Sequence, residues 1–287
     1  MGSSMSLRRV AERLLATAVS SPRLSRLLGR LADLEPPRPL LAAAIRAYAR
    51  AFGVDLAEAA LPPDAFPSFD AFFTRRLREG ARPVDRTEGV LVSPSDSRLA
   101  AIGRVPADLR LEQVKGETYA IEALLGSREA AATFSGGHAA TLYLSPAMYH
   151  RVHSPVDGLV RAWRYVPGRL FPVNAAGVRS IPGLFARNER VAVFCDSEAH
   201  GKVAVVLVGA ANVGRMSLAF APLVTNRGGK GVREEPASPV PLARGSDLGA
   251  FNRGSTVVLL VAAPALAPVA RAGELVRMGE PLWRASR

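Results

Sequence analysis

The chain has 287 residues, of which 48% are hydrophobic and 22% are charged. This balance excludes an intrinsically disordered protein and allows a substantial buried core. The formal net charge of +12 indicates a polyanionic partner, for which both nucleic acid and an anionic lipid surface qualify. With Cys195 as the only cysteine, an intrachain disulfide is excluded and a reducing compartment is the natural expectation.

Two short amphipathic helices are predicted over residues 5–34, separated by Ser21 and Pro22. Their apolar stripes are interleaved with arginines, and residues 1–50 contain nine arginines against three acidic residues. Such helices suit the headgroup layer of a membrane, although a helical cap packed on the core is an equal alternative. No secretory signal is recognisable, and no stretch reaches the roughly 20 apolar residues that span a bilayer. Any membrane contact is therefore expected to be peripheral.

A third helix is predicted from about Leu40 to Phe52, after three closely spaced prolines. From about residue 90, short β-branched and apolar runs alternate with glycine and proline, a pattern typical of antiparallel strands. The predicted fold class is α+β but mainly β, with N-terminal amphipathic helices followed by an antiparallel β-sandwich or barrel-like catalytic domain. We expect residues 1–64 to form a helical membrane-associating segment and residues 65–287 the catalytic domain.

Three segments contain residues that can carry chemistry. They are VSPSDS with Asp96, YHRVHSPVDG with His150 and His153, and FNRGSTVVLL with Ser255. The segments with Asp96 and Ser255 each have an ordinary explanation as a turn, whereas two histidines three residues apart are rarer. A metal site is not expected, because no further histidine or cysteine lies near the histidine pair. What remains is an acid, a base and a hydroxyl, the groups of a nucleophile with an oriented general base.

Several segments resemble, in the same order, the phosphatidylserine decarboxylase family. They cover the chain from Ser68 to the C-terminus and read SFDAFFTRRLREGARPVD, VSPSDS, VKGETYAIEALLG, YLSPAMYHRVHSPVDG, VNAAGVRSIPGLFARNERV, LVGAANVG and FNRGSTVV. The chain departs from the usual pattern at Ser97, Ala175 and Arg253, where glycine, proline and leucine are more common. Gly254 and Ser255, the reacting pair of the family, are present.

The resemblance implies self-cleavage. His153, oriented by Asp96, would remove the proton of Ser255, whose oxygen attacks the carbonyl of Gly254. The products would be a β chain of residues 1–254 and an α chain of residues 255–287, which remain associated. Residue 255 would become a covalent pyruvoyl group, the pyruvate cofactor, which serves as the electron sink for decarboxylation. His150 is expected to be the proton donor in that reaction.

The implied substrate is phosphatidylserine in anionic membranes, and the implied location is peripheral, at the cytoplasmic side of the cell membrane. Arg187, Arg190 and Asn174 are candidates for binding the headgroup, with structural salt bridges as the alternative for the arginines. A homodimer is plausible from the family. Two other functions stay open: a pyruvoyl-type decarboxylase of another serine-linked lipid, and an uncleaved, non-catalytic lipid-binding relative. Nucleic acid is not expected, because the basic charge is dispersed and no aromatic-basic stacking pattern is present.

Overall fold

The computed structural model describes residues 30–211, 215–226, 233–235, 238–252, 255–263 and 265–286. The predicted helix pair at residues 5–34 lies almost entirely outside the described residues, and so does Gly254. Within those ranges the chain is mainly β, and every pairing between strands is antiparallel. The prediction of a mainly antiparallel β fold is therefore confirmed, and the described strands do not close into a barrel.

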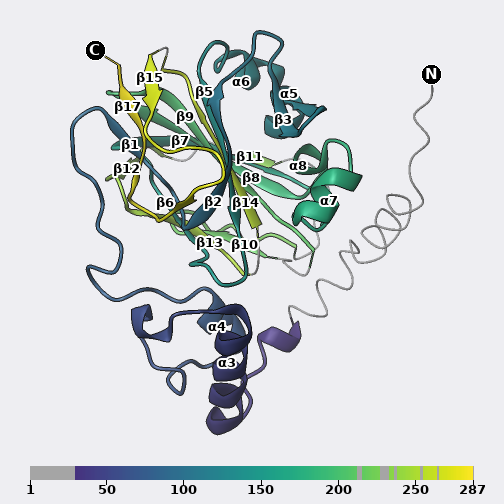
Figure 1. Ribbon diagram of the computed structural model, residues 1–287, viewed down its shortest axis with the longest axis vertical. Coiled ribbons are helices and arrows are strands. Elements are labelled where there is room, and N and C mark those ends of the chain that lie inside the picture. The colour runs from purple at the N-terminus through teal and green to yellow at the C-terminus, as the bar shows by residue number, and fades with distance from the viewer. Residues whose placement is uncertain are drawn as a thin grey trace.

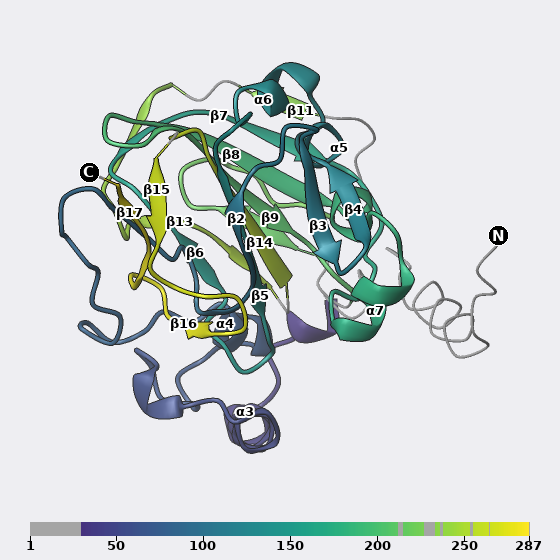
Figure 2. The same cartoon turned by 45° about the horizontal axis from the view of Figure 1, so that its top comes forward.

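The main sheet has nine strands in the described part of the chain, in the order β11-β7-β8-β9-β14-β5-β2-β16, with β12 also paired to β7. Their bounds are β2 (Ser97–Arg104), β5 (His138–Leu144), β7 (Gly158–Val166), β8 (Arg190–Ser197), β9 (Gly201–Val208), β11 (Arg233–Glu235), β12 (Val240–Leu242), β14 (Ser255–Val261) and β16 (Leu275–Val276). Figure 2 shows β14 in the interior of this sheet. It pairs with β5 on one side and β9 on the other.

Three smaller sheets and a set of short helices accompany the main sheet. The sheets are β10 (Met216–Leu218)-β13 (Asp247–Phe251)-β6 (Arg151–His153), β1 (Val90–Val92)-β17 (Pro281–Ala285)-β15 (Leu266–Pro268), and the hairpin β3 (Arg110–Val114)-β4 (Glu117–Ala120). The helices are α5 (Ile121–Leu125), α6 (Arg128–Ala132), α7 (Ala175–Ser180) and α8 (Leu184–Arg187). In Figure 1 the β1-β17-β15 sheet lies on one side of the main sheet and these helices on the other.

Each face of the main sheet buries a separate apolar core, which explains why its central strands are almost wholly apolar. Val257 and Leu259 of β14 belong to the core shared with the small sheets, whereas Val258 and Leu260 belong to the core under the helices. Because successive side chains of a strand point to opposite faces, Ser255 faces the first core. The next residue, Thr256, faces the second.

A helical unit precedes the β body and has its own small core. It contains α3 (Arg38–Phe52), a 3₁₀ turn η1 (Leu56–Glu58) and α4 (Phe69–Phe73), and its core residues include Ile45 and Phe72. Helix α3 matches the helix predicted at Leu40–Phe52 and ends at Gly53, whose left-handed conformation closes the last turn. Figure 1 shows α3 and α4 beneath the β10-β13-β6 sheet.

Within the part of the chain that the structure describes, no helix is long and apolar enough to cross a bilayer.

Candidate functional site

His150, His153 and Ser255 lie in segments that adjoin one another where the helical unit abuts the two sheets that contain β6 and β14. Among the described residues no hydrogen bond joins Ser255 to either histidine. Ser255 opens β14 opposite Leu144, the last residue of β5. From Leu144 the chain loops directly to His150, while the preceding strand β13 ends at Phe251, four residues before Ser255. The N–H of Phe251 donates to the carbonyl of His150 at 2.9 Å. The end of the loop that carries His150, just before β6 with His153, therefore lies beside the end of β13.

Ser255 is fully buried, and its hydroxyl has no hydrogen-bond partner in the described structure. Buried hydroxyls normally have partners, so an orphaned one needs an explanation. The β14 register fixes its backbone, and strand alternation turns its side chain towards the core that the β6 strand also covers. A hydroxyl held in place without a partner suits a nucleophile.

His150 is a buried, neutral base. Its Nδ1 lies 2.8 Å from the carbonyl oxygen of Met148, so Nδ1 carries the hydrogen and Nε2 keeps its lone pair. Nε2 has no partner in the described structure, and the ring packs against Phe73 of α4 with centroids 4.2 Å apart. Burial lowers the pKa of His150 to about 3, assisted by the charge of Arg75. As a result, the ring can donate a proton only after it has first accepted one.

His153 is also oriented as a base. Its Nδ1 lies 2.9 Å from the carbonyl oxygen of Gly245, and its Nε2 lies 3.2 Å from the Tyr149 hydroxyl, which therefore donates to it. Burial lowers the pKa of His153, while the negative charge of Asp247 opposes that shift. The Nε2 lone pair can therefore accept another proton only when Tyr149 releases it.

We expected Asp96 to orient His153, but in the structure Asp96 forms its hydrogen bonds with other groups. Its carboxylate accepts hydrogen bonds from Arg82 Nε at 2.8 Å, from Arg82 Nη2 at 2.6 Å and from the Met278 N–H at 2.9 Å. No hydrogen bond joins Asp96 to either histidine of the site. A guanidinium fork is the better partner because it offers a permanent charge and two donors in one plane.

Arg82 also binds Glu58, so one buried guanidinium joins η1 of the helical unit to the β body. Arg82 Nη1 and Nη2 lie 3.0 and 2.7 Å from the two carboxylate oxygens of Glu58. Burial alone would lower the pKa of Arg82, but the hydrogen bonds to Asp96 and Glu58 outweigh it and raise that pKa. We did not expect Arg82 from the sequence, where nothing local distinguishes it from the other arginines of its segment.

The three predicted headgroup residues do not gather at one place. Arg190 is buried and donates to the carbonyls of Ala123, Leu124 and Asn188. These contacts indicate a structural role for Arg190. Burial lowers the pKa of Arg190 to about 10. Asn174 caps α7 by accepting the Gly177 N–H at 3.0 Å. Only Arg187 has an exposed guanidinium, which lies over the Phe171 ring at 5.0 Å.

A cavity of about 780 Å³ opens on the helix-covered face of the main sheet. Its walls include Tyr143, Val173 and Phe185, and Thr256 extends it to the start of β14. Charged side chains also line it, namely the basic Arg98, Lys115 and Arg179 and the acidic Glu112. Apolar walls with several cationic groups suit an amphiphilic anion.

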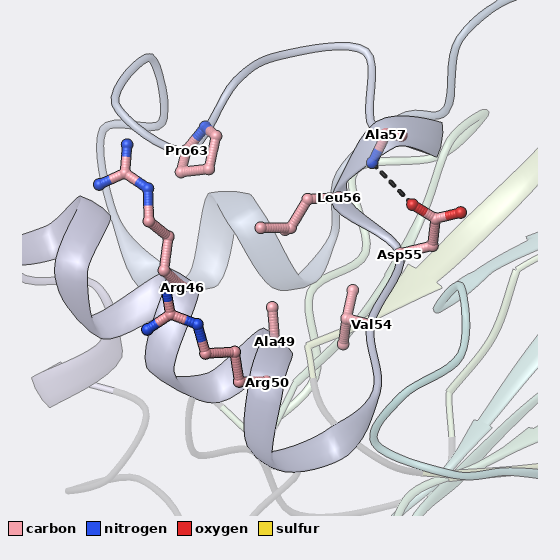
Figure 3. A pocket seen from close by; sticks show the side chains of 8 residues that line it. All are labelled: Arg46, Ala49, Arg50, Val54, Asp55, Leu56, Ala57 and Pro63. Carbon is pink, nitrogen blue, oxygen red and sulfur yellow. Dashed lines mark hydrogen bonds between the residues drawn. The ribbon is translucent and has the colours of Figure 1, made fainter.

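A second cavity, of about 510 Å³, lies in the helical unit. Figure 3 shows Arg46 and Arg50 projecting from neighbouring turns of α3 beside Leu56, with Pro63 across the opening. It is separate from the histidine site and adds two cations to the surface of the helical unit.

Among the described residues no group of three or more histidine, cysteine or acidic side chains is placed to hold a metal ion.

Removing the buried charge of Arg82 should destabilise the protein much more than removing an exposed one. Arg82→Met leaves the carboxylates of Asp96 and Glu58 without their shared counterion, and we expect a loss of about 3 kcal/mol in the free energy of unfolding, measured in urea. Arg277→Met is the matched control, because Arg277 lies 3.7 Å from the same Glu58 but is exposed. It should cost about 1 kcal/mol or less. Equal losses in the free energy of unfolding for the two variants would contradict the role of Arg82 as the buried counterion of Asp96 and Glu58.

Comparison with known proteins identifies the family. The family described as phosphatidylserine decarboxylase matches residues 69–284. A phosphatidylserine decarboxylase proenzyme of Anaeromyxobacter sp. (strain K) is 46% identical over 92% of this chain and 94% of its own length. The proenzymes of Myxococcus xanthus and Stutzerimonas stutzeri are each 43% identical, over 83% and 92% of this chain and 84% and 90% of their own lengths. The resemblance seen in the separated motifs is confirmed, and the chain belongs to the phosphatidylserine decarboxylase family.

Proposed function

We propose that this protein is made as a proenzyme, cuts itself between Gly254 and Ser255, and decarboxylates phosphatidylserine to phosphatidylethanolamine and CO₂. The observation that carries the proposal is the Ser255 hydroxyl, buried and unpartnered at the first residue of a central strand. Family membership supports it, because relatives that cover most of this chain are named phosphatidylserine decarboxylase proenzymes.

In the proposed cleavage, the Ser255 oxygen attacks the carbonyl carbon of Gly254 while His153 takes the hydroxyl proton on Nε2. The peptide C–N bond breaks and an ester forms. Loss of the Cα proton and cleavage of the Ser255 C–O bond then free the Gly254 carboxylate and leave dehydroalanine, whose hydrolysis releases ammonia and leaves a pyruvoyl group. The Gly245 carbonyl orients His153 by holding Nδ1. Asp96 contributes its negative charge, which favours the protonated ring.

The α chain that begins at residue 255 would remain bound without a peptide link. Its first strand, β14, pairs along its length with β5 and from Thr256 onward with β9, and its side chains are buried on both faces. The same fragment contains β16, which pairs with β2, and β17, which pairs with β1. Hydrogen bonds and apolar burial of this extent do not depend on the bond that breaks.

Residue 255 can accommodate a pyruvoyl group. The Ser255 hydroxyl, which is lost in the conversion, has no hydrogen-bond partner, so its loss leaves no other buried polar group unpaired. When present, that group supplies an electron sink for the electron pair left by the departing CO₂. His150 is the residue that we propose handles the proton at the reacting carbon, since its Nε2 is neutral and unpartnered. Its buried ring against Phe73 excludes water from that nitrogen.

We propose that the cavity beside Thr256 receives the substrate, which requires the pyruvoyl group at residue 255 to turn from the Ser255 face of β14 towards the Thr256 face once the bond to Gly254 is cut. Arg98, Lys115 and Arg179 offer positive charge to the phosphate and carboxylate of the headgroup, and the apolar walls suit the glycerol and acyl portions. Arg187 remains the one exposed guanidinium of the predicted headgroup residues. Asn174 and Arg190 act on the backbone around them.

Peripheral attachment to the cytoplasmic side of an anionic cell membrane is the proposed role of the helical segment at residues 1–64. Most of the large apolar side chains that the described structure exposes belong to this segment: Leu31, Leu34, Leu40, Phe52 and Leu61. Arg46 and Arg50 line its surface cavity and add positive charge (Figure 3). Exposed apolar groups beside arginines are the composition of an interfacial membrane segment.

Intact-mass spectrometry should find two chains that divide between Gly254 and Ser255, with the α chain blocked by a group that has lost ammonia. Ser255→Ala removes the nucleophile and should give one chain of 30.4 kDa, allowing for the lost oxygen. A single uncut chain from the parent sequence would contradict self-cleavage and would favour the alternative of a non-catalytic lipid-binding protein. Two chains that release CO₂ only from another serine-linked lipid would support the alternative substrate.

The two histidines should separate cleavage from turnover. His153→Ala should leave an uncut chain, because the proposed base for Ser255 is removed. His150→Ala should still give two chains but lose at least about 100-fold in decarboxylation, the usual contribution of a general acid or base. Gel electrophoresis and CO₂ release from phosphatidylserine check the two steps. Normal turnover by cleaved His150→Ala would exclude its proposed role.

Membrane attachment can be tested with a double variant, Leu40→Gln with Phe52→Gln. We expect its affinity for vesicles of phosphatidylglycerol and phosphatidylcholine to fall about tenfold or more, because two apolar side chains no longer enter the headgroup layer. Leu275→Gln is the matched control, because Leu275 in β16 is 62% exposed against 63% for Leu40. An equal loss of vesicle binding in the control would argue against the helical segment as the attachment site.

A further inference from the structure

We propose that Asp247 is a positioning residue for self-cleavage, which stabilises the positive charge that His153 acquires when it takes the proton of Ser255. The proposal rests on the self-cleavage proposed above. It adds a second carboxylate to the site, on the strand that leads to the cleaved bond.

The strand register places Asp247 against His153. The two are cross-strand partners in the β13-β6 ladder, so their side chains project from the same face of the pair. The backbone beside them is tightly held, since the Ser154 N–H donates to the Ser246 carbonyl at 2.7 Å and the Gly245 N–H donates to the Ser154 carbonyl at 2.8 Å. The short segment 245–247 thus supplies both the carbonyl that orients the ring and the carboxylate beside it.

One oxygen of the Asp247 carboxylate is uncommitted. Its Oδ2 forms an ion pair with Arg151 and lies 3.7 Å from Arg76. Its Oδ1 is buried and has no hydrogen-bond partner in the described structure. A buried carboxylate oxygen without a partner is costly at rest. That cost falls when a positive charge develops next to it, as it does on His153 during proton transfer.

The other charged groups around His153 leave Asp247 as the main electrostatic support. Asp247 and Asp96 favour the protonated ring, with Asp247 the stronger of the two, and Arg151 opposes it. Asp96 is already engaged by Arg82 and the Met278 N–H. The remaining neighbour, Tyr149, is uncharged at neutral pH because burial raises its pKa to about 12.

Because Asp247 pairs with Arg151, the proposal can be tested by comparing the loss of the negative charge with the loss of the positive charge. If Asp247 acted only as the structural partner of Arg151, removing either charge would slow cleavage alike. If Asp247 acts on His153, removing the negative charge slows cleavage, whereas removing the positive charge of Arg151 does not. Arg151→Gln serves for this comparison, because glutamine removes the positive charge and keeps a polar side chain. Arg151 also donates to the Thr74 carbonyl at 3.2 Å, so the folding of this variant is checked as well.

The experiment follows self-cleavage of the full chain during cell-free synthesis, with a time course on denaturing gels from pH 5.5 to 9. Asp247→Asn should cleave about tenfold more slowly, because a histidine without this negative neighbour is a weaker base for the Ser255 proton. Its rate should also rise with pH at a lower midpoint, because losing a negative neighbour lowers the pKa of the base. Asp247→Glu should recover much of the rate, and Arg151→Gln should cleave at or above the parent rate.

Parent-like cleavage by Asp247→Asn would overturn the proposal, and so would equal slowing by Asp247→Asn and a folded Arg151→Gln. If Asp247→Asn does not fold, judged by circular dichroism, Arg151→Gln decides alone: slower cleavage by that variant overturns the proposal. A parent chain that never cleaves at Gly254 and Ser255 would instead refute the proposed function. The two failures are therefore distinguishable.

Discussion

The two-sided pairing of β14 is the constraint on which the rest of the structure depends. Its seven residues all pair with β5, the six from Thr256 onward also pair with β9, and its side chains complete the cores on both faces. This pairing fixes Ser255 at the edge of the site and directs Thr256 into the cavity on the opposite face. One strand thus positions the candidate nucleophile and a wall of the candidate substrate cavity by the alternation of two consecutive residues.

Burial determines the chemistry of the groups around that strand. His150 and His153 are neutral because desolvation lowers their pKa values, and each offers Nε2 because a backbone carbonyl holds Nδ1. Two of the carboxylates near them are paired, Asp96 with Arg82 and Asp247 with Arg151, and the buried Arg75 guanidinium lies over the Phe72 ring. The site therefore combines neutral bases with compensated charges, so proton transfer to a histidine creates the one new charge that the surroundings must stabilise.

Much of the fold could be predicted from the sequence, because strand patterns and proline breaks are local signals. The antiparallel β texture, the helix near Leu40–Phe52 and the strand beginning at Ser255 all match. The partner of Asp96 could not be predicted, since it depends on which of several similar arginines folds back onto it. The role of Arg190 was equally hidden, because only the fold brings the carbonyls of Ala123 and Leu124 to its guanidinium. Hydrogen-bond partners distant in sequence leave no local pattern.

The helical unit is also part of the wall of the site. Phe73 covers the His150 ring, Asp70 accepts a hydrogen bond from Asn252 at 2.6 Å, and Glu58 shares Arg82 with Asp96. A shortened protein that begins after this unit, made to improve solubility for crystallisation or inhibitor screening, would expose His150 and deprive Arg82 of Glu58, one of its two carboxylate partners. Protein engineering should instead keep residues 38–73 and substitute their outward-facing apolar side chains one at a time.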